Sequence, residues 1–186
     1  MKERVILLLL ALSISLFFLD QYVITQEPEM KNRTSMSAKQ ADTGIEVGQK
    51  APDFRLKTSK GEIISLSSLK GKNILINFWA SWCPPCKAEM PHIQEFYDNY
   101  KNQNIAVLSV NLTHLDRDEQ TVQEFIKRNH LTFPVVYDTR GEVDEVYQAN
   151  TIPTSYIIDQ NGIIQHRIVG PVSTDRLEKI FSALPK

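Results

Sequence analysis

The chain has 186 residues, of which 42% are hydrophobic and 23% are charged, and its formal net charge at pH 7 is −1. This composition is typical of one globular domain with short appendages. Basic residues are spread along the chain rather than clustered, which argues against nucleic acid as a partner.

The chain contains two cysteines, Cys83 and Cys86. One such short loop cannot hold 186 residues together, so a disulfide-stapled mini-fold is excluded, and so is a zinc site with four thiolates. A mixed zinc site would also need two histidines, and the spacing typical of zinc ligands is absent among them. These histidines are His92, His114, His130 and His166. We therefore expect no metal.

Residues 1–25 have the pattern of a membrane anchor. Lys2 and Arg4 precede an apolar run from Val5 to Leu19, and counting on to Ile24 gives the roughly 20 residues that a spanning helix needs. No A-x-A cleavage site follows, so we expect an uncleaved, single-pass signal-anchor with the rest of the chain outside the cytoplasm. A cleaved signal peptide and a buried core helix are the alternatives. Residues 26–45 are polar and predict a flexible tether to a domain that spans residues 46–186.

The first half of that domain predicts a β-hairpin, a central strand and a long helix. A short strand follows Phe54, Lys60-Gly61 marks a turn, and residues 63–66 form the second strand. Residues 74–79 are a dense apolar run, as in a strand buried on both faces. A helix should run from the cysteine motif to about residue 100, with a kink at an internal proline and one apolar face. The proline is Pro91, and the face consists of Met90, Ile93, Tyr97 and Tyr100.

The second half alternates strands and helices and then closes with a hairpin. Strands are predicted at residues 105–110 and 133–137, and helices at 118–129 and 141–149. Asn161-Gly162 predicts the turn of a hairpin between residues 155–159 and 163–169. Ser173 can cap a last helix whose core face is Leu177, Ile180, Phe181 and Leu184. This order predicts an α/β domain with a mixed central sheet covered by helices on both faces.

The motif Cys83-Pro84-Pro85-Cys86 lies where a buried strand ends and a helix begins. Its spacing places both sulfurs within reach of one small disulfide ring. Cys83 is at the helix start, where unpaired N–H groups and the helix dipole favour the thiolate, so it is the expected nucleophile. Cys86 is one turn further in and is the expected resolving thiol. The pair therefore predicts a thiol–disulfide oxidoreductase that needs no cofactor beyond its own redox-active disulfide.

Residues next to the motif are candidates for substrate binding. Trp82 directly precedes Cys83, and Pro84 and Pro85 stiffen the first helical turn without adding N–H donors. Ile152-Pro153 comes just before a strand, where a cis peptide bond would form a tight corner. An ordinary loop proline is the alternative for Pro153.

The segment from Asn77 to Lys87 resembles the active-site segment of the thioredoxin superfamily. Residues 151–154 (Thr-Ile-Pro-Thr) are similar to its cis-proline loop, and residues 48–54 are similar to the N-terminal segment shared by TlpA/ResA-type proteins and peroxiredoxins. The helix at 118–129 is similar to the inserted helix of the TlpA/ResA branch. The resemblance implies a thioredoxin-like fold, a tether to the cell membrane with the catalytic domain on its outer face, and electrons from a membrane thiol transporter of the CcdA/DsbD type. It also implies exported clients, such as apocytochrome c or envelope and spore proteins, and we expect a monomer.

Two departures from the family affect the expected proton transfer. Thioredoxins carry a buried Asp where this chain has Asn77, and ResA-type proteins often carry Glu where this chain has Pro84. Some group must accept the proton that Cys86 loses when it attacks. Glu89, His114 and Asp116 are the candidates, although a glutamate on a helix surface is usually only solvated.

Three alternatives remain beside a reductase. A disulfide-forming oxidant is disfavoured because oxidants of the DsbA type carry a histidine between their cysteines, and Pro84-Pro85 offers no such donor. A peroxidase would need its cysteine in a P-x-x-x-T-x-x-C context, which is missing. A module that binds a client or a metal without turnover would not depend on Cys86.

Overall fold

The computed structural model describes residues 41–185. The predicted anchor at residues 1–25, and residues 26–40 of the predicted tether, lie outside the described residues. Among residues 41–185, no helix combines the length and the apolar character needed to cross a bilayer.

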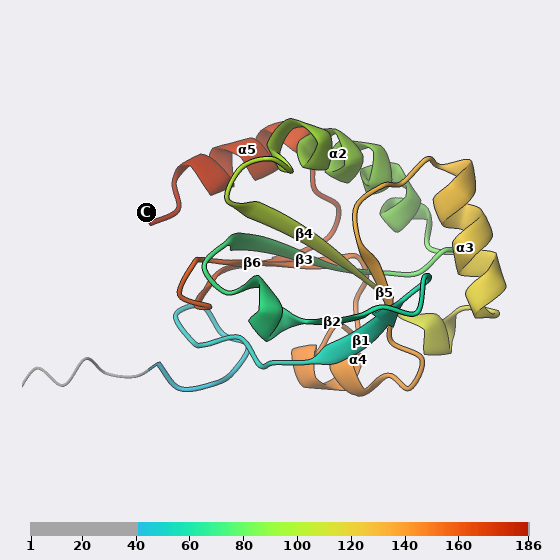
Figure 1. Ribbon diagram of the computed structural model, residues 1–186, viewed down its shortest axis with the longest axis horizontal. Coiled ribbons are helices and arrows are strands. Elements are labelled where there is room, and N and C mark those ends of the chain that lie inside the picture. Colours follow the sequence, from blue (N-terminus) through green and yellow to red (C-terminus); the bar gives the residue numbers. More distant parts are fainter. Residues whose placement is uncertain (1–40, 186) are drawn as a thin grey trace, which may run out of the picture. The chain divides into compact units, whose positions relative to one another are not determined.

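The described residues form one seven-stranded mixed sheet (Figure 1). Its spatial order is β2-β1-β5-β4-β3-β6-β7. The central strand β3 runs parallel to β4 and antiparallel to β6, and the β1–β2 hairpin joins antiparallel to β5 at one side. The strands are β1 (Arg55–Thr58), β2 (Ile63–Ser65), β3 (Asn73–Trp79), β4 (Ile105–Asn111), β5 (Val135–Tyr137), β6 (Thr154–Ile158) and β7 (Ile164–Val169).

Four α-helices and two short 3₁₀ helices in residues 41–185 cover this sheet. Figure 1 shows α2 and α5 side by side on one face and α4 on the other. The helices are α2 (Pro84–Tyr100), α3 (Glu119–Arg128), α4 (Glu142–Tyr147) and α5 (Thr174–Ser182), with η1 (Leu66–Leu69) and η2 (Thr113–Leu115). The predicted α/β architecture, with a thioredoxin-like arrangement of a mixed sheet, an N-terminal β-hairpin and an inserted helix (α3), is therefore confirmed.

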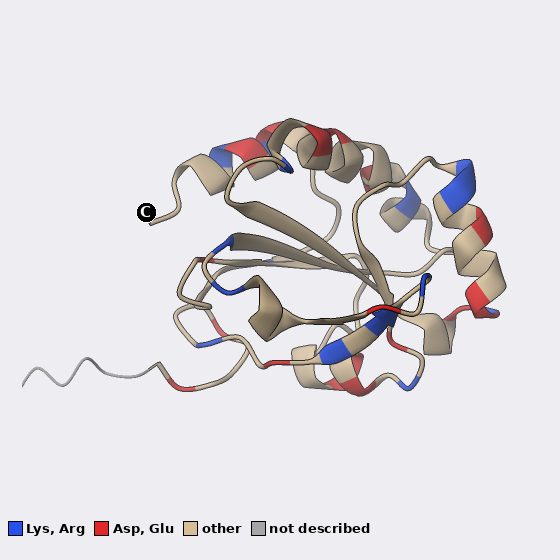
Figure 2. Ribbon diagram, viewed as in Figure 1, with Lys and Arg blue, Asp and Glu red and all other residues tan. Residues whose placement is uncertain are grey.

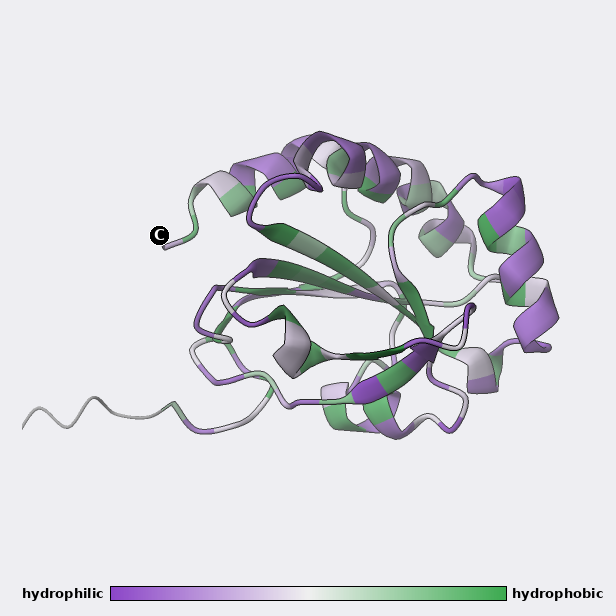
Figure 3. Cartoon of the chain, in the orientation of Figure 1, coloured by the Kyte–Doolittle hydropathy of each residue, from purple (hydrophilic) through white to green (hydrophobic). Residues whose placement is uncertain are grey.

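Two hydrophobic clusters fill the two faces of the sheet, because alternate residues of a strand point to opposite sides. On β3, Leu75 and Trp79 belong to the cluster under α2, α3 and α5, whereas Ile76 and Phe78 belong to the cluster over α4. Figure 3 shows the central strands as hydrophobic and the outer helix faces as hydrophilic, and Figure 2 shows that β3, β4 and β6 carry no charged residue. The polar side chains on these strands are all uncharged, and those of Asn77, Ser109 and Ser155 are fully buried.

Several predicted boundaries need correction. The second strand ends at Ser65 rather than Leu66, because the Ser65 hydroxyl accepts the Ser68 N–H at 3.2 Å and starts η1. The predicted tether is too long at its end: the Gly44 N–H donates to the Lys50 carbonyl and Ile45 is buried, so residues 42–45 belong to the domain.

The predicted core face of the long helix is also only partly right. Met90 and Ile93 are buried as expected, but Phe96 is the next fully buried residue, and Tyr97 and Tyr100 lie at the edge of the cluster. In the β6–β7 turn, Gly162 adopts a positive φ of 84°, whereas Asn161 does not.

Candidate active site

The loop between β3 and α2 is held in place by Asp116, which follows η2. Its carboxylate accepts the Ser81 backbone N–H at 3.0 Å and the Ser81 hydroxyl, and it also accepts the Asn111 side-chain amide at 2.9 Å. Because Asn111 is the last residue of β4, this one carboxylate ties the loop to the carboxyl ends of β3 and β4. The residues just before the cysteine motif are thus held in place by hydrogen bonds.

Cys83 and Cys86 form a disulfide across the first turn of α2, with their Cα atoms 5.3 Å apart. Cys83 is the residue before the helix, and Pro84 and Pro85 are its exposed first two residues. The two prolines have no N–H, so the first amide of this turn that can point toward the Cys83 sulfur is that of Cys86. Cys86 is the less accessible cysteine, with an exposed fraction of 0%.

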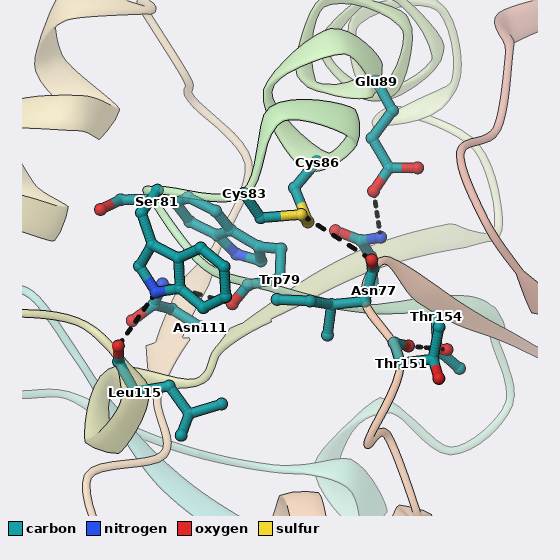
Figure 4. The surroundings of a disulfide bond; sticks show 12 residues. Asn77, Trp79, Ser81, Cys83, Cys86, Glu89, Asn111, Leu115, Thr151 and Thr154 are labelled. Atoms are coloured by element: carbon teal, nitrogen blue, oxygen red, sulfur yellow. Dashed lines mark hydrogen bonds between the residues drawn. A yellow bond between two sulfur atoms is a disulfide. The ribbon is translucent and has the colours of Figure 1, made fainter.

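Cys83 is also enclosed, since only 3% of it is exposed. The segment before β6 covers it: the Cys83 Sγ lies 3.8 Å from the Ile152 carbonyl oxygen, a contact drawn as a dashed line from the sulfur in Figure 4. The Ile152–Pro153 peptide bond is cis. The Pro153 carbonyl in turn accepts the Gly170 N–H at 2.8 Å, just beyond β7. The fold thus brings the cysteine motif and the Ile152–Pro153 segment together.

An exposed apolar surface borders the disulfide. Trp82 is 54% exposed and its indole Nε1 donates to the Leu115 carbonyl at 2.9 Å, while the Leu115 side chain is 49% exposed. The dashed line that ends at the Leu115 oxygen in Figure 4 marks this hydrogen bond. Leu115 was not singled out from the sequence, because a leucine in a polar loop carries no signal for this role. Trp82, Leu115, Pro84, Pro85 and Ile152 together form what we call the apolar rim.

Glu89 is a buried residue of α2, with an exposed fraction of 1%. Its carboxylate accepts the Asn77 Nδ2 hydrogen at 2.8 Å and the Val172 backbone N–H at 2.9 Å. Burial raises the pKa of Glu89 to about 7, and the two hydrogen bonds oppose that rise. The interpretation of Glu89 as a solvated surface residue is therefore wrong, and the site does contain a buried carboxylate. The carboxylate comes from α2 rather than from the Asn77 position.

A sequence signal for this burial exists. Glu89 lies three residues after Cys86 and four before Ile93, and both of those residues are buried. Helix residues three or four apart share a face, so Glu89 falls on the same buried stripe.

The other two proton-acceptor candidates are occupied elsewhere. His114 places Nδ1 at 3.2 Å from the Asp138 carbonyl oxygen and Nε2 at 3.4 Å from Asp144 Oδ2, so its ring belongs to the loop at the start of α4. The Asp116 carboxylate is used by Ser81 and Asn111. Of the three candidates, Glu89 is the one placed on the helix face that carries Cys86.

A cysteine pair at the start of a helix, faced by a cis-proline loop on a mixed sheet, defines a thioredoxin-like protein that exchanges thiols and disulfides. Comparison with known proteins identifies the family within that class. Residues 47–167 match the AhpC/TSA family, and the chain belongs to that family.

Named relatives agree with the chemistry of the site. The chain is 44% identical to the thiol-disulfide oxidoreductase ResA of Oceanobacillus iheyensis over 136 residues, which cover 71% of this chain and 69% of the relative. It is 41% identical to the sporulation thiol-disulfide oxidoreductase A of Bacillus subtilis, over 68% of this chain and 76% of the relative. A putative thiol:disulfide interchange protein DsbE from Chlorobium tepidum superposes with a TM-score of 0.69 at 33% identity, covering 76% of this chain and all of the other. The protein is therefore a thiol–disulfide oxidoreductase of the ResA type.

Proposed function

We propose that this oxidoreductase reduces disulfides of exported proteins on the outer face of the cell membrane. The observation that carries the proposal is the Cys83–Cys86 disulfide at the start of α2, faced by the Ile152–Pro153 loop and bordered by the apolar rim. The rim suits an extended, partly unfolded client, because such a segment exposes apolar side chains on both sides of its cysteine.

The proposed reaction has two thiol-exchange steps. The Cys83 thiolate attacks one sulfur of the client disulfide, and the other client sulfur leaves as a thiolate. Cys86 then loses its proton and attacks the Cys83 sulfur, which releases the second client thiolate and leaves the Cys83–Cys86 disulfide. The client gains two electrons and the enzyme loses two. A membrane thiol transporter of the CcdA/DsbD type is the proposed electron source that restores the dithiol.

Glu89 is the proposed acceptor of the Cys86 proton. A general base works best when its pKa is near the pH of the reaction, and burial raises the pKa of Glu89 to about 7. Glu89 and Cys86 are also neighbours on one face of α2, since they are three residues apart.

Weak stabilisation of the Cys83 thiolate supports the proposed direction of the reaction. A strong oxidant owes its potential to stabilisation of its reduced form. Here Pro84 and Pro85 remove two N–H donors from the turn that holds Cys83, and no histidine lies between the cysteines. A less stabilised thiolate favours oxidation of the enzyme, and therefore reduction of the client.

The proposed location rests on the N-terminal sequence. Lys2 and Arg4 followed by the apolar run to Leu19 would anchor the chain with its catalytic domain outside the cytoplasm. Among exported proteins, apocytochrome c and proteins of the envelope or the spore are the proposed clients, and the protein is proposed to act as a monomer.

Trapping of mixed disulfides tests the proposal. Full-length Cys86→Ser, expressed in membranes, should accumulate covalent adducts between Cys83 and its clients that a reductant releases. The matched control Cys83→Ser/Cys86→Ser should accumulate none. Failure to trap any protein through Cys83 would overturn turnover by this pair. A redox titration then tests the direction, because a potential near the roughly −120 mV of DsbA would contradict a reductase.

A further inference from the structure

Asn77 is a polar residue at the centre of the most apolar part of the sheet. It lies on β3 with an exposed fraction of 0%, and its register neighbours are Ser109 on β4 and Ser155 on β6. Side chains in register on adjacent strands share a face, so the three form a polar row across β4, β3 and β6 under α2. A buried polar row of this kind calls for an explanation beyond packing.

The nitrogen and the oxygen of the Asn77 carboxamide differ in their hydrogen bonding. Nδ2 donates to Glu89 Oε1 at 2.8 Å and to Ser155 Oγ at 3.2 Å. Oδ1 is buried and accepts no hydrogen bond from the described residues. Figure 4 shows this oxygen on the side of the Cys83–Cys86 disulfide and the nitrogen on the side of Glu89. In the disulfide form neither sulfur carries a hydrogen that Oδ1 could accept.

We propose that Asn77 is a positioning residue that couples the protonation of Cys86 to that of Glu89 by turning its carboxamide over. This inference rests on the proposed role of Glu89 as proton acceptor. A half-turn of an asparagine amide exchanges a donor for an acceptor within almost the same volume. The two orientations therefore match the two places where the proton can reside.

Before resolution the proton is on Cys86 and Glu89 is ionised. Nδ2 then donates to the carboxylate, as in this structure, and Oδ1 accepts the Cys86 S–H. When Cys86 attacks, its proton passes to Glu89 and its electron pair forms the bond to the Cys83 sulfur, while the client sulfur leaves with the electron pair of the broken bond. With the amide turned over, Oδ1 accepts the O–H of protonated Glu89 and Nδ2 faces the Cys86 sulfur.

The surroundings of the amide tolerate both orientations. The hydroxyl of Ser155 can donate as well as accept, so it suits either end of the amide. The Ser109 hydroxyl, on the other side of Asn77, has no hydrogen-bond partner among the described residues, so it holds the amide in neither orientation. The Val172 N–H holds the other oxygen of Glu89 in place in both states.

Of the described titratable residues on α2, Cys86 and His92 lie three residues before and after Glu89, and Glu95 lies six residues after it. The His92 ring and the Glu95 carboxylate both contact the Thr174 hydroxyl. β3 and β6 contribute the neutral side chains of Asn77 and Ser155, and the segment before α5 contributes a backbone N–H. A change in the pH profile at this site can therefore be assigned to the Cys86–Glu89 pair.

The test isolates the resolving step. A thionitrobenzoate mixed disulfide on Cys83 is formed in acid, a pH jump starts the attack by Cys86, and the released thionitrobenzoate is followed by its absorbance. We expect Asn77→Leu to be at least about tenfold slower than wild type at neutral pH and its pH profile to move upward. The matched control Ser109→Ala, in the same polar row, should retain the wild-type profile. Wild-type rates in Asn77→Leu would overturn the proposal.

A second measurement needs no substitution that could impair folding. In the wild-type dithiol form, the side-chain amide resonances of Asn77 should move with the same pH midpoint as the carboxyl carbon of Glu89. One unchanged amide environment throughout the Glu89 titration would overturn the proposal.

Glu89→Gln separates this proposal from the one on which it rests. If Glu89→Gln resolves the mixed disulfide at the wild-type rate, Glu89 is not the proton acceptor. If Glu89→Gln is slow while Asn77→Leu is normal, the coupling by Asn77 alone is wrong.

Discussion

The Glu89 carboxylate accepts the backbone N–H of Val172 at 2.9 Å, across 83 positions of the chain. This bond joins the middle of α2 to the segment that leads into α5, and it holds an ionisable group in the protein interior. Both stability and proton transfer should therefore depend on the state of Glu89.

Stability of the oxidised protein should contain a pH-dependent contribution from Glu89. Burial raises its pKa from 4.5 to about 7, so between these values the folded protein keeps a proton that the unfolded chain releases. The contribution is fully present below pH 4.5 and is lost as pH rises through about 7, and it amounts to about 3 kcal/mol. Urea unfolding of wild type and Glu89→Gln at several pH values across this range measures it. The free energy of unfolding should fall with pH more steeply in wild type than in Glu89→Gln. Glu124→Gln, at an exposed position, is the control and should show the wild-type pH dependence. If Glu89→Gln also showed the wild-type pH dependence, the raised pKa of Glu89 would be contradicted.

Trp82→Ala should weaken the reaction with protein disulfides selectively. The indole is exposed beside Cys83, and an aromatic contact of this kind contributes about 1–2 kcal/mol to binding, which corresponds to about a tenfold lower second-order rate. The rate with a small aromatic disulfide should change little. Stopped-flow measurements on the reduced enzyme compare the two substrates. Ile63→Ala, which removes an equally exposed side chain on β2, is the control, and an equal loss in both variants would argue against a client-binding role.

Asp116→Ala should destabilise the loop before the cysteines. It leaves the Ser81 N–H, the Ser81 hydroxyl and the Asn111 amide without their acceptor, and we expect the free energy of unfolding to fall by about 2 kcal/mol. Asp116→Asn keeps one carbonyl oxygen as an acceptor, so its free energy of unfolding should fall by less. Denaturant unfolding of both variants checks that Asp116→Ala loses more stability than Asp116→Asn. If Asp116→Asn kept full stability but lost the resolving step, Asp116 would be the proton acceptor instead of Glu89.

Tyr147→Phe should loosen the N-terminal part of the domain. The Tyr147 hydroxyl, on α4, donates to the Pro52 carbonyl at 2.6 Å, and its loss should cost about 1 kcal/mol. Hydrogen exchange should then be faster at the amides of residues 51–54 than in the rest of the sheet. Tyr97→Phe, at the edge of the α2 face, serves as the control, and uniform exchange rates would contradict a local effect.

The sequence was sufficient for much of the fold because its signals are local. The dense apolar runs of β3 and β4, the cap at Ser173 and the turn at Gly162 depend on neighbouring residues, and each appears where the sequence predicts it. The predicted boundaries were wrong where a hydrogen bond overrides the hydrophobic pattern of the sequence. The Ser65 hydroxyl ends β2 early, and the pairing of Gly44 with Lys50 moves the start of the domain.

For the site, the sequence by itself determined the redox pair. The spacing of Cys83 and Cys86 and the prolines between them specify a disulfide in one helical turn, because all the atoms involved lie within four residues. The proton chemistry was decided only by the tertiary structure. A glutamate on a helix is solvated or buried according to what packs on that face, and here β3 and the Val172 segment, distant in sequence, enclose Glu89 and orient Asn77 toward it. Desolvation then sets the pKa, and desolvation is a property of the folded chain.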